Sequence, residues 1–219
     1  SRKKNVLKPK RIYPFLIHHV AVFLRTIWNL RVTFENKDLI PKDEKFLLIL
    51  NHQSMLDSIT FLSCFPEHQF TFFVKESLIR FPFVGHYLHA AGFISIDRKN
   101  NRKAMENIFL GINLLKSGRT LAIYPEGTRS RSANLGAFRS GAFKPAQKAE
   151  APIVVAVADG FYKKRARFPF VPARVFIKII EVIPYQEFKD LSTNEISENV
   201  RELIQTNMDE ARQKYSWLK

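Results

Sequence analysis

The feature that most constrains the fold of this chain is an alternation of short apolar runs with segments of helical periodicity. Apolar residues recur at helical spacing over 104–115, and Gly118 follows as a stop signal. Strands separated by helices predict an α/β fold with a mainly parallel central sheet flanked by helices. The runs with the length and composition of buried strands are 31–35, 46–50, 69–74, 93–96, 121–124, 153–157 and 175–180.

The last part of the chain predicts a long helix. Ser192 and Glu195 have the spacing of a capping box, in which each side chain binds the backbone N–H of the other residue. An apolar stripe at helical spacing follows this start signal, formed by Ile196, Val200, Leu203, Ile204 and Met208.

A polar motif, Asn-His-Gln-Ser-Met-Leu-Asp, follows the predicted strand 46–50. Histidine is the default general base in enzymes, and a nearby carboxylate can hold its ring in one tautomer and stabilise the protonated form. His52 and Asp57 would point about 140° apart on one straight helix. They can meet if His52 precedes a helix that begins at Ser54, or at Asp57 itself, and Asp57 lies in its first turn.

A second motif, Tyr-Pro-Glu-Gly-Thr-Arg over 124–129, has the residue types of an anion site. Gly127 separates Glu126 from Arg129, so backbone N–H groups and a guanidinium can approach the same anion. A base in one loop and an anion site in another describe an enzyme that moves a proton beside a phosphate. By itself, the His–Asp spacing more often marks a buried histidine and a helix cap, and the second motif is what favours catalysis.

Taken together, the blocks of the sequence resemble the glycerolipid acyltransferase superfamily, and within it the bacterial 1-acyl-sn-glycerol-3-phosphate acyltransferases. The resemblance covers about 32–182, and Val155 departs from it because the family often has a proline there. The matching blocks, in chain order, are NHxxxxD at 51–57, KESL at 75–78 with Pro82 and Gly85, GFISIDR at 92–98, YPEGTRSR at 124–131, GAF at 141–143 and APIVV at 151–155.

The resemblance implies transfer of a fatty acyl group from acyl-CoA or acyl-acyl carrier protein to the sn-2 hydroxyl of lysophosphatidate, which gives phosphatidic acid. His52 would be the general base and Asp57 would orient it. Loop amides near Gly127 are candidate oxyanion donors. The acceptor-phosphate region would comprise Glu126, Gly127, Thr128 and Arg129, with Arg98 as a second candidate and Lys75 and Arg131 as weaker ones.

The composition restricts the classes of molecule that this chain is expected to bind. The chain has 35 Lys and Arg against 20 Asp and Glu, a net charge of +15, which favours anionic partners such as an anionic membrane surface. Twenty Phe and the lack of any nucleic-acid-reading motif argue against nucleic acid. The single cysteine, Cys64, allows no internal disulfide and fits a reducing cytosolic face. No metal-ligand spacing, P-loop or GxGxxG motif occurs, so no metal or nucleotide cofactor is expected.

Residues 1–30 are interpreted as a basic, amphipathic element that anchors an acyltransferase domain, 31–219, at the cytoplasmic face of the membrane. The uncharged segment 12–24 is shorter than the ~20 apolar residues of a bilayer span. A signal peptide is disfavoured because no small-residue cleavage site follows it. The preferred interpretation is a helix lying in the membrane interface with Trp28 in the interfacial belt, and the alternative is a helix packed on the protein's own core.

Two further alternatives remain open at this level. The aromatic and cationic stretch 161–170 suits contact with a membrane or an acidic carrier protein, or equally a solvated loop. A thioester hydrolase of the same fold would consume the acyl donor without a lipid acceptor, and a purely binding protein would show no turnover.

Overall fold

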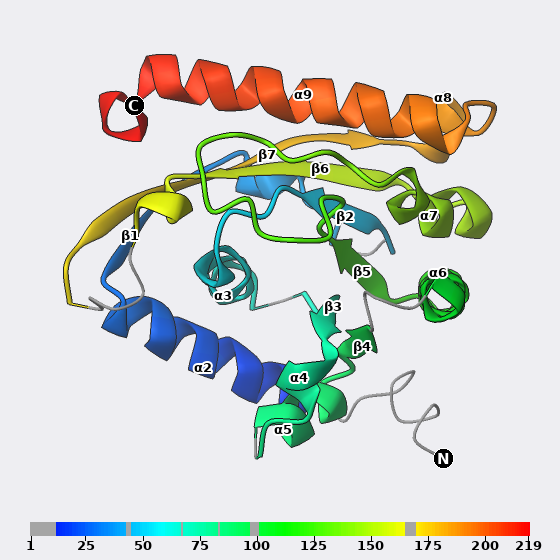
Figure 1. The fold of residues 1–219 in the computed structure, drawn as a ribbon, viewed down its shortest axis with the longest axis horizontal. Coiled ribbons are helices and arrows are strands. Elements are labelled where there is room, and N and C mark those ends of the chain that lie inside the picture. The colour runs from blue at the N-terminus through cyan, green and yellow to red at the C-terminus, as the bar shows by residue number, and fades with distance from the viewer. Residues whose placement is uncertain (1–11, 43–44, 67, 83, 97–100, 165–169) are drawn as a thin grey trace.

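The structure is a computed structural model of the 219-residue chain. It describes residues 12–42, 45–66, 68–82, 84–96, 101–164 and 170–219 (Figure 1). Arg98, the basic segment 2–11 and residues 165–169, for which roles were predicted, lie outside the described residues.

A seven-stranded sheet forms the centre of the described chain, in the order β1-β7-β6-β2-β5-β3-β4. All neighbouring strands are parallel except β6 and β7, which are antiparallel. The predicted α/β class and the mainly parallel sheet are therefore confirmed. The strands are β1 (Leu30–Glu35), β2 (Leu47–Leu50), β3 (Phe70–Lys75), β4 (Ile94–Ile96), β5 (Thr120–Ile123), β6 (Ile153–Asp159) and β7 (Ala173–Ile183).

Helices cover both faces of this sheet. In Figure 1, α9 runs along β6 and β7 on one side, whereas α2 and α3 lie on the other. The helices of the described residues are α2 (Ile12–Ile27), α3 (Met55–Cys64), α4 (Glu76–Ile79), α5 (Val84–Ala90), α6 (Asn101–Lys116), α7 (Lys144–Ala149), α8 (Tyr185–Phe188) and α9 (Thr193–Lys214).

The alternating side chains of β2 supply both hydrophobic cores. Leu47 and Ile49 belong to the core under α6, α7 and α9, while Leu48 and Leu50 belong to the core under α2 and α3. All four side chains are at most 1% exposed. A central parallel strand is buried on both faces, which explains why this run is apolar throughout.

Helix α9 begins as the sequence predicted. The Ser192 hydroxyl accepts the Glu195 N–H at 3.3 Å, and the Glu195 carboxylate accepts the Ser192 N–H at 2.7 Å. Its apolar stripe packs on the sheet, with Ile196, Val200, Ile204 and Met208 buried and Leu203 partly buried.

Helix α2 has two apolar faces. On one face Tyr13 and Ile17 pack on the core, and Ala21 is buried. Trp28, predicted to lie in an interfacial belt, is partly buried and packs against this same core. No helix within the described residues has the length and apolarity needed to cross a bilayer. The opposite face of α2 exposes large apolar side chains, namely Ile12, Phe15, Leu16, Val20 and Phe23.

Candidate active site

The first polar motif turns from the end of β2 into α3. Asn51 is anchored to β6, because its side-chain amide donates to the Ala158 carbonyl at 2.9 Å and its side-chain carbonyl accepts the Ala158 N–H at 2.8 Å. Ser54 caps α3, and Asp57 is the third helical residue of a capping box. His52 therefore precedes the helix and Asp57 lies in its first turn, which is the arrangement that lets the two side chains meet.

His52 and Asp57 are in direct contact. The His52 Nδ1 atom lies 3.0 and 3.1 Å from the two Asp57 carboxylate oxygens. Asp57 is fully buried and also accepts backbone N–H groups from Gln53, Ser54 and Ser58 at 2.7–2.8 Å. Since a carboxylate accepts hydrogen bonds, we assign the proton to Nδ1, which leaves the lone pair of Nε2 available as a base.

Tyr124 supports the histidine ring from one side. The two rings are stacked, with centroids 3.9 Å apart and planes inclined by 18°. The Tyr124 hydroxyl hydrogen-bonds the Ser58 hydroxyl at 2.6 Å. Burial, together with the negative charge of Asp57, raises the pKa of Tyr124 well above its ordinary value, so this tyrosine stays neutral. The ring of His52 is thus held between a carboxylate and an uncharged aromatic face.

Glu126 joins the second motif to the first. One carboxylate oxygen accepts the His52 backbone N–H at 2.8 Å and the other accepts the Gly136 N–H at 3.1 Å. The Ser130 N–H donates to the His52 carbonyl at 2.8 Å, so both backbone groups of His52 are held by this loop. Burial raises the pKa of Glu126. Both oxygens of Glu126 thus accept backbone N–H groups, and Glu126 fixes the backbone of His52.

Gly136 leaves room for this contact with Glu126. A Cβ atom at position 136 would lie 2.5 Å from a Glu126 carboxylate oxygen, closer than the two atoms can approach. Gly127 has φ +70°, a backbone conformation that favours glycine, and its N–H donates to the Tyr124 carbonyl at 3.0 Å. This amide, a candidate oxyanion donor from the sequence, is therefore engaged in the turn of its own loop.

The other predicted phosphate residues are accessible. Thr128 and Arg129 are exposed, and Arg129 makes no hydrogen bond or ion pair with another described residue. Lys75 is exposed at the carboxyl end of β3. Strand β2 is parallel to β3 and ends at the same edge of the sheet, and His52 follows β2 in the chain. Arg98 lies outside the described residues.

Sequence reasoning missed Arg139, which lies at this loop, and the ion pair between Arg212 and the buried Asp159. A Cβ on Gly127 would lie 2.9 Å from Arg139 Nε, so the Arg139 side chain packs against the second motif. Arg212 of α9 forms an ion pair with Asp159 at 2.7 Å. Neither arginine lies in a recognisable motif, so no sequence signal marked them.

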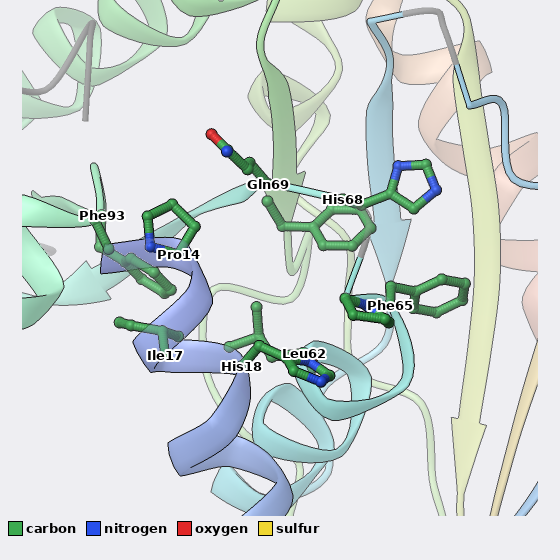
Figure 2. A pocket seen from close by; sticks show the side chains of 11 residues that line it. Pro14, Ile17, His18, Leu62, Phe65, His68, Gln69 and Phe93 are labelled. Atoms are coloured by element: carbon green, nitrogen blue, oxygen red, sulfur yellow. Dashed lines mark hydrogen bonds between the residues drawn. The ribbon is translucent and has the colours of Figure 1, made fainter. Parts of the chain in front are cut away.

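A small hollow lies at the opposite end of α3 from Asp57. Figure 2 shows it between α2, the end of α3 and the start of β3. Its mostly apolar lining contains none of the predicted site residues. Among the lining side chains are Ile17, His18, Leu62, Phe65, His68 and Phe93.

Comparison with known proteins identifies the family to which this chain belongs. The family model described as Acyltransferase matches residues 31–158, more than half of the chain. The chain belongs to the acyltransferase family. The predicted resemblance is confirmed, and the predicted pair His52 and Asp57 lies within the matched region, as does the second motif at 124–129.

Individual relatives of this acyltransferase carry more specific names. The chain is 25% identical over 191 residues to the 1-acyl-sn-glycerol-3-phosphate acyltransferase of Borreliella burgdorferi, covering 83% of this chain and 75% of that protein. It is 30% identical over 161 residues to human 1-acyl-sn-glycerol-3-phosphate acyltransferase beta, covering 72% and 57% of the two chains.

A solved structure is similar over most of this acyltransferase. The 1-acyl-sn-glycerophosphate (LPA) acyltransferase PlsC from Thermotoga maritima superimposes with a TM-score of 0.76 and 26% sequence identity, covering 91% of this chain and 81% of that one. The similarity thus extends beyond residues 31–158 of the family model into the remainder of the fold.

Proposed function

We propose that this protein transfers a fatty acyl group from an acyl thioester to the sn-2 hydroxyl of lysophosphatidate, giving phosphatidic acid. The observation that carries this proposal is the His52–Asp57 pair, held against the second motif by Glu126 and Ser130. The names of the relatives supply the substrate class.

In the proposed mechanism, His52 Nε2 removes the proton of the acceptor hydroxyl as its oxygen attacks the thioester carbonyl. Asp57 stabilises the imidazolium that forms. When the tetrahedral intermediate collapses, the carbon–sulfur bond breaks and the imidazolium returns its proton to the thiolate. The new ester and the free thiol leave His52 neutral for the next cycle, and no acyl-enzyme is needed.

We assign the acceptor phosphate to the exposed edge of the second motif. Arg129 is exposed there, and its planar guanidinium suits two parallel hydrogen bonds to a phosphate. Arg139 lies against Gly127 and adds positive charge beside it. Lys75 and Arg98 remain further candidates. Glu126 contributes indirectly, because it fixes the backbone of His52.

An acceptor-by-donor activity panel with the purified protein in detergent tests this function. Acyl transfer to lysophosphatidate, with either acyl-CoA or acyl-acyl carrier protein, is the expected result, and the panel identifies the preferred donor. Loss of the thioester at the same rate with and without acceptor would instead identify a hydrolase and contradict the proposal.

Arg129→Ala is expected to raise the KM for lysophosphatidate far more than the KM for the acyl donor. The physical reason is the loss of a charge-assisted hydrogen bond, which contributes about 1.5–3 kcal/mol. Arg129→Lys should restore only part of the affinity, because a point charge does not reproduce the guanidinium fork. Steady-state kinetics with each substrate varied in turn provides the measurement.

Arg31→Ala is the matched control, since Arg31 is exposed on β1 at the far edge of the sheet. It should leave both KM values near those of the wild type. Equal increases in the two KM values for Arg129→Ala would show that Arg129 only supports the loop.

We propose further that residues 1–30 anchor the 31–219 domain to the cytoplasmic face of a membrane. The support is the exposed face of α2, where Phe15 and Phe23 are 61% and 62% exposed. The lone Cys64 fits the reducing side of that membrane. Since the other face of α2 packs on the core, removing the whole helix would uncover that core as well. Substitutions on the exposed face are therefore the cleaner test.

Phe15→Gln combined with Phe23→Gln is expected to release the protein from anionic vesicles, because both side chains would lose their burial in the acyl region. Phe109→Gln is the matched control, since Phe109 is 60% exposed but lies on α6. Co-sedimentation with vesicles at low and high salt measures the membrane binding of both variants and of the wild type. High salt should weaken binding of the wild type without releasing it, because salt screens charge but not apolar burial. Full release of the wild type by salt would contradict the buried anchor.

A further inference from the structure

A chain of buried polar contacts connects α9 to the loop that carries the base. Asp159, the last residue of β6, is fully buried, and its carboxylate accepts Arg212 Nε at 2.7 Å and Arg212 Nη2 at 3.3 Å. The same carboxylate accepts the Gln53 side-chain amide at 2.8 Å. A buried carboxylate requires such partners, because an unpaired one is strongly disfavoured away from water.

Gln53 connects the Arg212–Asp159 ion pair to the His52–Asp57 pair. It directly follows His52 in the chain, and its side-chain carbonyl accepts the Phe161 N–H at 3.1 Å. Its side chain is therefore fixed at both ends. Its backbone N–H donates to the Asp57 carboxylate at 2.8 Å. A displacement of Gln53 would thus shift both the backbone next to His52 and a donor that holds Asp57.

Helix α9 also binds the loop that completes the second motif. Arg212 Nη2 donates to the Ala133 carbonyl at 2.5 Å, and Arg201 Nε donates to the Gly136 carbonyl at 3.4 Å. Gly136 is the residue whose N–H binds Glu126, which in turn holds the His52 backbone. Figure 1 shows α9 along β6 and β7, on the side of the sheet opposite α2 and α3.

We propose that Arg212 and Asp159 are positioning residues of the acyl-transfer site. Through these two residues, α9 fixes the position of the His52–Asp57 pair relative to the 131–139 loop. This inference rests on the proposed function. Both residues lie outside the segment that the family model matches, residues 31–158. In the proposed mechanism one loop binds the acceptor and another deprotonates it, so the rate depends on the relative position of the two loops.

The test compares three variants of the full chain. Arg212→Gln removes the charge and the fork, and Arg212→Lys restores the charge alone. Lys214→Gln is the matched control, because Lys214 lies on the same helix and pairs with Glu35 at 2.6 Å, away from the site. Kinetics with lysophosphatidate varied, thermal melting, and hydrogen exchange of the 51–58 and 131–139 segments are measured for each.

Arg212→Gln is expected to lower kcat/KM by on the order of 10–10², the effect of a small misplacement of reacting groups. The kcat should fall because the base shifts, and the KM for lysophosphatidate should rise because the 131–139 loop loosens. Hydrogen exchange should increase in both segments. Arg212→Lys should recover part of kcat but less of KM, and Lys214→Gln should match the wild type.

Unchanged kinetics per folded molecule in Arg212→Gln, with only a lower melting temperature, would overturn the proposal. If Arg212→Gln does not fold, Arg212→Lys decides the matter, since wild-type kcat, KM and exchange in that variant would equally overturn it. Failure of the wild type to acylate lysophosphatidate would instead reject the proposed function. The exchange data would still report whether Arg212 braces the two loops.

Discussion

Replacing His52 by alanine is expected to lower the rate of acyl transfer by about 10²–10⁴, the range for loss of a general base. The acceptor hydroxyl would then have no group to take its proton during attack on the thioester. Initial rates with saturating lysophosphatidate and acyl donor provide the measurement, on protein whose folding is checked by circular dichroism and thermal melting.

The fold should survive this substitution. The backbone N–H and carbonyl of His52 are held by Glu126 and Ser130, and those contacts do not involve the ring. His86→Ala is the control, since His86 is exposed on α5 and far from this hydrogen-bond network. Near-wild-type turnover in well-folded His52→Ala would remove His52 from the mechanism.

Asp57→Asn is expected to lower the rate by a similar order, roughly 10²–10⁴, because the ring loses both its tautomer and its stabilising charge. This variant should also lose stability. The Asp57 oxygens accept N–H groups from Gln53, Ser54 and Ser58 as well as Nδ1 of His52. An amide nitrogen in place of either oxygen would face at least one of these donors, which costs about 1–3 kcal/mol for the unsatisfied group.

The two effects are separated by expressing the rate per folded molecule and by measuring urea unfolding in parallel. Asp38→Asn is the control for loss of a negative charge, since Asp38 is exposed and lies in a short turn after β1. A folded Asp57→Asn enzyme with undiminished kcat would show that His52 needs no carboxylate partner and would contradict the mechanism.

Local signals in the sequence determined most of the fold. Each predicted strand overlaps an observed one, because a short apolar run such as Leu47–Leu50 suits a central strand that is buried on both faces. The capping signals at Ser54 and Ser192 also acted locally, since each cap binds backbone only two or three residues away. For the same reason the contact between His52 and Asp57 was predictable once the start of α3 was placed.

Tertiary structure decided the contacts between distant segments. Glu126, assigned from the sequence to the phosphate region, turns inward to the His52 backbone, because the parallel pairing of β2 and β5 brings their carboxyl ends together. Arg212 reaches Ala133 and Asp159 only because α9 packs across β6. The helical stripe of α9 specifies that one face is buried, but not which strands it covers. Long-range polar partners depend on how whole elements dock, and periodicity and spacing along the chain do not encode that docking.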